Sequence, residues 1–102
     1  MSERLTQLLK MLEREPTDPF LLYGVAMEHK KAGRAPDAIE FFERTIAADA
    51  GYCYAYHQKG LVHESTGDVE AAKSAYRAGV AAATKKGDEH ARSEIQAALD
   101  ML

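Results

Sequence analysis

The residues of this chain that could do chemistry are its single cysteine and its four histidines. Cys53 and His57 lie four residues apart, so on a helix they would share one face. A reactive thiolate needs an imidazole or a positive field beside it, and a third group to orient the imidazole. The sequence places no aspartate or asparagine to orient His57. We therefore expect Cys53 to be an inert, partly buried residue, and we expect no catalytic site.

His29 and His63 form a second candidate pair, to which Cys53 or His90 could add ligands. A metal site needs three or four converging ligands, and these spacings do not match the ligand spacing of zinc fingers. No glycine-rich loop for a phosphate is present in the sequence either. We expect the two histidines to be packing residues that stay neutral when buried, with some loss of stability below about pH 6. No metal and no cofactor are expected.

Composition narrows the class of protein and the kind of partner. The 102 residues suit one domain, with 46% apolar and 28% charged residues and a net charge of -3. The longest basic runs, Lys30-Lys31 and Lys85-Lys86, are too short for a nucleic-acid partner. No apolar stretch approaches the roughly 18 residues of a membrane span, and no apolar signal core follows Ser2. With one cysteine and so no internal disulfide, the predicted compartment is the cytoplasm.

The elements that must position these residues are helices. Apolar residues recur three and four apart from the start of the chain, as at Leu5, Leu8, Leu9 and Leu12. Proline, glycine and aspartate interrupt this spacing, and no segment alternates with period two. The sequence predicts an all-α chain of six helices of about 12 to 16 residues, without strands.

The chain also repeats itself after 34 residues. Gly33 then coincides with Gly67, Ala38 with Ala72, and the apolar or aromatic positions of both segments coincide as well. The matched pairs are His29 and His63, Phe20 and Tyr54, Phe42 and Tyr76, Met27 and Leu61, and Ile46 and Val80. A fixed period of this length is typical of stacked helical repeats.

A 34-residue unit of two helices resembles the tetratricopeptide repeat (TPR) family. The family pattern is carried in the first copy by Leu22, Val25, Ala26, Gly33, Ala38 and Phe42, and in the second by Tyr56, Lys59, Gly60, Gly67, Ala72 and Tyr76. The chain departs from the pattern at His29 and His63, at Gly79, and at Ala50 and Thr84, where a closing proline is usual. The resemblance implies a superhelix (solenoid) of antiparallel helix pairs: a half-repeat helix at 1–17, repeats at 19–52 and 53–86, and a capping helix at 87–102.

The resemblance also implies a concave groove, lined by the first helix of each repeat, that holds a protein or peptide. The groove positions would be Phe20, Tyr23, Met27, Lys30, Lys31, Tyr54, His57, Leu61, Glu64, Ala91 and Ile95. Large apolar groups away from the core stripe support this interpretation. We expect an aromatic floor, a basic side at Lys30-Lys31 and an acidic side near Glu64.

Two alternatives stay open. The groove floor could instead pack under the terminal helices, and the module could self-associate or form part of a larger scaffold, through Leu5, Leu8 and Leu12 or through Ile95, Leu99 and Leu102. Some family members grip an acidic C-terminal tail with Lys and Asn, but Tyr23 and Met27 stand at those positions. The favoured hypothesis is an adaptor that binds a protein segment with apolar anchors.

Overall fold

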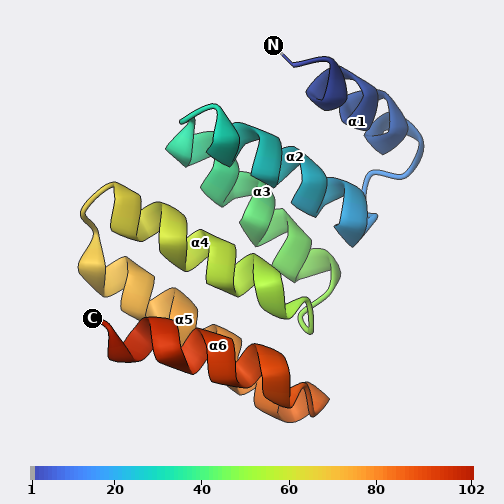
Figure 1. Ribbon diagram of the computed structural model, residues 1–102. Coiled ribbons are helices and arrows are strands. Elements are labelled where there is room, and N and C mark those ends of the chain that lie inside the picture. Colours follow the sequence, from blue (N-terminus) through green and yellow to red (C-terminus); the bar gives the residue numbers. More distant parts are fainter. Residues whose placement is uncertain (1) are drawn as a thin grey trace.

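The computed structural model describes residues 2–102, which form six helices joined by short turns. The helices are α1 (Glu3–Arg14), α2 (Pro19–Lys31), α3 (Ala35–Ala48), α4 (Cys53–Ser65), α5 (Val69–Lys86) and α6 (Glu89–Asp100). They follow one another through the molecule in chain order, from α1 at one end to α6 at the other (Figure 1). Residues 2–102 contain no strand, so the prediction of an all-α repeat fold is confirmed.

Local signals in the sequence set where the helices begin and end. The Asp18 carboxylate accepts a hydrogen bond from the Phe20 backbone N–H at 2.9 Å, and Asp68 accepts one from Ala71 at 3.1 Å. Such caps satisfy N–H groups that have no partner within a helix. Gly33 and Gly67 follow α2 and α4 with φ of 77° and 81°, a left-handed conformation that suits glycine and ends each helix.

The spacing of the helices follows the repeat in the sequence. α2 begins at Pro19 and α4 at Cys53, while α3 begins at Ala35 and α5 at Val69, so both pairs of starts are 34 residues apart. One helix differs from expectation: α5 has 18 residues, more than the predicted upper length. No proline follows the alanine-rich end of α5, and the helix continues until Gly87, whose φ is 79°.

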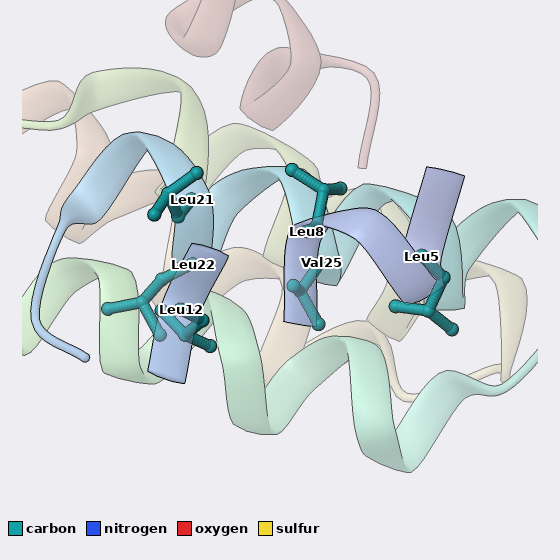
Figure 2. Close-up of a cluster of buried hydrophobic side chains, with 6 residues drawn as sticks. All are labelled: Leu5, Leu8, Leu12, Leu21, Leu22 and Val25. Carbon is teal, nitrogen blue, oxygen red and sulfur yellow. The ribbon is translucent and has the colours of Figure 1, made fainter. Parts of the chain in front are cut away.

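The core consists of three clusters that follow one another along the stack. In the first, Leu5, Leu8 and Leu12 of α1 lie against leucines and a valine of α2 (Figure 2). The other two clusters centre on the aromatic residues Phe42 and Tyr76, both fully buried. Each cluster is built mainly from helices that are close in sequence, as expected for a repeat protein.

Two glycines allow the helices to approach one another closely. A Cβ at Gly60 would lie 2.2 to 2.7 Å from atoms of the Tyr76 ring, so the absence of a side chain makes room for that ring. A Cβ at Gly79 would lie 2.8 Å from Cβ of Tyr56. Gly79 therefore stands where the family has alanine because α4 and α5 are too close here for a methyl group.

Candidate functional site

The candidate site lies on one face of α2 and α4. Phe20, Tyr23 and Met27 recur at helical spacing on α2, and Tyr54, His57 and Leu61 recur at the same spacing on α4. We call these six residues the aromatic face. On α4 they lie opposite Tyr56, Lys59 and His63, which line a separate hollow between α3 and α5.

Two members of the aromatic face are exposed to solvent. The Phe20 side chain is 66% exposed and that of Tyr54 is 36% exposed. Tyr23, Met27 and His57 are half-buried. The face therefore combines exposed apolar rings with a more firmly held floor, which is a typical composition for a protein interface.

Tyr23 is held by two neighbouring aromatic rings. Its ring centroid lies 4.9 Å from that of Tyr52 and 5.7 Å from that of Phe42. Burial, together with the nearby Tyr52 and Tyr54 phenols, raises the pKa of Tyr23 to about 12. The phenol therefore stays protonated and can donate a hydrogen bond. Since Met27 also packs against the buried cluster around Phe42, part of the expected floor supports the fold.

The centre of the face is polar. The Lys30 amine donates a hydrogen bond to the side-chain oxygen of Gln58, which links α2 to α4. The His57 ring meets Tyr76 edge-on, with centroids 6.0 Å apart. Burial lowers the pKa of His57, and the nearby positive charge of Lys30 lowers this pKa further. The carboxylates of Glu94 and Glu64 act on it in the opposite direction. Burial also lowers the pKa of the Lys30 amine.

The charged residues expected at the two sides of the groove differ in their surroundings. Lys31 is exposed, whereas Lys30 is half-buried and bonded to Gln58. Glu64 is exposed, and its carboxylate accepts a hydrogen bond from the phenol of the buried Tyr76. Glu64 therefore provides the hydrogen-bond acceptor for a buried phenol and also places a negative charge at this edge of the face.

Two expected groove residues belong to the core instead. Ala91 and Ile95 are both fully buried, in a cluster with Tyr76. Because α5 extends to Lys86, α6 begins at Glu89, which is 36 residues after the start of α4 and not 34. At about 100° per residue, this shift by two residues rotates α6 by roughly 200° about its axis. The residues expected in the groove consequently face α5.

The rotation of α6 brings other residues beside the aromatic face. The Tyr54 hydroxyl donates a hydrogen bond to the Glu94 carboxylate at 3.1 Å, and Nε2 of His90 lies 2.7 Å from the same carboxylate. Sequence reasoning missed Glu94, His90 and the linking amide of Gln58. The extended run from Ala81 to Lys86 before Gly87 was the signal that could have revealed the change in register.

The cysteine and the paired histidines do not form a reactive site. Cys53 is 3% exposed, and its thiol donates to the Gly51 carbonyl at 3.3 Å. Burial raises the pKa of this thiol, which is the opposite of activation. His29 packs against Phe41 and accepts a hydrogen bond from Arg34 at 2.9 Å. Within residues 2–102, no three or more His, Cys, Asp or Glu side chains gather where they could hold a metal ion.

The apolar stripes of the two end helices pack mainly against the rest of the chain. Leu5, Leu8 and Leu12 are at most 7% exposed; in the last stripe Ile95 is fully buried, Leu99 is half-buried and Leu102 is 37% exposed. The stripes considered for self-association are thus mostly covered within one chain. None of the helices in the described part of the chain combines the length and apolar character required to span a membrane.

Comparison with known proteins places these features in a family. No model of a known protein family matches the chain. A TPR repeat-containing protein of Pseudomonas aeruginosa is 30% identical over 88 residues, which cover 86% of this chain and 84% of that protein. The chain belongs to the tetratricopeptide repeat family. Folds of this family serve generally as protein-interaction modules.

Solved structures agree with the TPR assignment. The crystal structure of a TPR domain protein from Salinibacter ruber is 32% identical, with a TM-score of 0.73, and covers 80% of this chain and 91% of its own. The solution structure of a TPR domain protein from the same organism has a TM-score of 0.76. A solution structure from Bordetella parapertussis, 23% identical, has a TM-score of 0.84 over 99% of this chain and so matches nearly the whole TPR fold.

Proposed function

We propose that this TPR chain is an adaptor that binds a segment of another protein on its aromatic face. The observation that carries the proposal is the exposure of Phe20, at 66%, on the same face as Tyr54 at 36%. Large apolar rings on one face of a water-soluble helix layer lose contact with water when a partner covers them. The proposed role is to hold a partner and not to transform it, since the Cys53 thiol is buried and protonated.

The polar groups of the face would orient the bound segment. Lys30 and Lys31 place positive charge at the C-terminal end of α2, whereas Glu94 and Tyr54 provide acceptors near the start of α4. A segment with apolar anchors between an acidic and a basic end would complement both. Binding would be modest, because two repeats offer a small area.

The test uses two residues of the face that belong to none of the three core clusters. Tyr23 and His57 are poor choices because they also support Phe42 and Tyr76. The double variant Phe20→Ser and Leu61→Ser removes two apolar groups of the face. Val69→Ser is the matched control, because Val69 is 43% exposed on α5, outside the face.

A partner would be captured with the wild-type chain and its affinity then measured by calorimetry. The double variant should lose about tenfold or more in affinity, as loss of apolar anchors does, while Val69→Ser should bind normally. Equal binding by all three folded proteins would place the site elsewhere.

A further inference from the structure

A hollow of about 420 Å³ opens between α3 and α5, on the side of α4 away from the aromatic face. We call it the α3–α5 hollow. Its volume lies in the range of small-ligand pockets, about 300 to 1,000 Å³. Ile39, Glu43 and Ile46 form the α3 wall, and His63 of α4 lies at its floor.

The equivalent place one repeat earlier is filled by the chain itself. A shift of 34 residues places Phe41 where Ala75 lines the hollow, and His29 where His63 lines it. The centroids of the Phe41 and His29 rings are 5.5 Å apart, and Phe41 also packs against the leucine cluster of α1 and α2. The Arg44 guanidinium lies 4.6 Å from the centre of the Phe41 ring. An aromatic side chain thus seals the first of two equivalent positions.

At the second position α5 supplies no aromatic side chain, although Tyr56 of α4 is among the residues that line the hollow. Ala75 replaces Phe41 and Ala78 replaces Arg44, and both alanines line the hollow. On α3, Ile39 and Ile46 are consequently only half-buried, although their equivalents Leu5 and Leu12 are 1% and 7% exposed. The small α5 residues therefore leave a concavity of mixed apolar and polar lining where an aromatic ring would complete the packing.

We propose that the α3–α5 hollow binds an aromatic side chain of a partner protein, in the place that Phe41 takes one repeat earlier. The ring would rest on Ala75 and Ala78 and pack against His63, as Phe41 packs against His29. This second docking point is independent of the aromatic face. A partner that used both faces would gain affinity from each.

An ion pair in the lining of the hollow indicates which aromatic residue fits best. The Lys59 ammonium and the Glu43 carboxylate lie 3.2 Å apart at its wall. Val25 and Leu9 occupy the corresponding positions one repeat earlier, around Phe41. A phenol hydroxyl could hydrogen-bond with this ion pair, so tyrosine should bind better than phenylalanine.

The first test uses small probes and nuclear magnetic resonance. N-acetyl-tyrosinamide should shift backbone amides around His63, Ala75 and Ala78 in a saturable way, more than N-acetyl-phenylalaninamide does, while N-acetyl-leucinamide should not. Ala75→Phe should abolish these shifts by supplying the ring from within. Ala81→Phe, an exposed alanine on the same helix, should leave them unchanged. Shifts that persist in Ala75→Phe, or that do not depend on an aromatic ring, would overturn the proposal.

Thermal unfolding of the two variants checks that they remain folded. Ala75→Phe should melt at a higher temperature than wild type because it fills a hollow, whereas Ala81→Phe should melt near wild type. A lower melting temperature for Ala75→Phe would mean that the hollow does not accept a ring, which also contradicts the proposal.

The second test selects peptides from a displayed random library. Binders should be enriched in tyrosine, lose about tenfold or more in affinity to Ala75→Phe, and keep their affinity for Phe20→Ser. Binders sensitive only to Phe20→Ser would point to the aromatic face alone and count against the hollow. A dimer of the chain that Ala75→Phe dissociates would identify the occupant as a second copy, which would also overturn the proposal.

Discussion

At the scale of single residues, glycine decides how closely α4 and α5 pack. The Tyr76 ring occupies the space where a side chain at Gly60 would begin. The repeat in the sequence predicts a small residue at this position, but it does not distinguish alanine, as at Ala26, from glycine. The choice depends on the ring that packs opposite, and this is visible only in the folded chain.

Gly60→Ala should destabilise the protein by about 1 to 3 kcal/mol, because the new methyl group collides with the buried ring. Gly24→Ala is the matched control: its Cβ would meet only the flexible Leu8 side chain, at 3.2 Å. Urea unfolding would measure both. Similar stability for the two variants would show that the Tyr76 ring can move aside.

His57 should make stability depend on pH. Folding lowers the pKa of this imidazole from its usual value of 6.5, chiefly through burial. The unfolded chain therefore takes up the proton first as the pH falls. The contribution of the neutral His57 to the free energy of unfolding is fully present above about pH 6.5. It declines as the pH falls from there toward the lower pKa of the folded state.

Unfolding by urea between pH 8 and pH 5.5 would test this dependence in wild type and in His57→Gln. The wild-type free energy of unfolding should fall more steeply below pH 6.5 than that of the variant. Parallel curves would assign the pH dependence to other groups. The sequence predicts this behaviour for His29 and His63, whereas the burial of the imidazole in the structure predicts it for His57.

At the scale of helices, most boundaries could be predicted from the sequence because caps and breakers are local. Asp18, Gly33 and Gly67 act as their types suggest. The orientation of α6 could not be predicted from the period alone, since it depends on the length of α5. The shift of two residues in the start of α6 placed Ala91 and Ile95 in the core and brought Glu94 beside Tyr54.

The end of α5 should depend on glycine at position 87. Its φ of 79° is unfavourable for a residue with a side chain, so Gly87→Ala should cost about 1 to 2 kcal/mol. Gly51→Ala is the control, because Gly51 is not among the glycines with positive φ. Thermal unfolding of the two variants, compared with wild type, would measure the difference. Equal melting temperatures would mean that the turn can adopt another conformation.

At the scale of the whole molecule, the apolar stripes of both end helices are mostly covered within one chain. Leu5, Leu8, Leu12 and Ile95 are all buried, while the exposed apolar side chains of the end segments are Met11 at one end and Met101 and Leu102 at the other. We therefore expect a monomer. Light scattering coupled to size-exclusion chromatography should give a mass near 11.2 kDa at every concentration. A mass that rises with concentration would contradict this.

The 34-residue repeat made the architecture predictable, but it concealed how the two repeats differ. The same alignment that pairs Gly33 with Gly67 also pairs Phe41 with Ala75. Comparison of similar positions indicates the shared fold. The dissimilar positions mark where the stack is left open, because Ala75 and Ala78 line the hollow between α3 and α5.

The arrangement of the helices in chain order, each packed mainly on its neighbours, has a consequence for folding. Few contacts require distant parts of the chain to find one another, so the entropy lost in closing long loops is small and folding should be rapid. Structure can nucleate at any helix pair and spread outward. The terminal helices, which have a neighbour on one side only, should exchange their amide hydrogens fastest, and the α3–α4 centre should exchange them slowest.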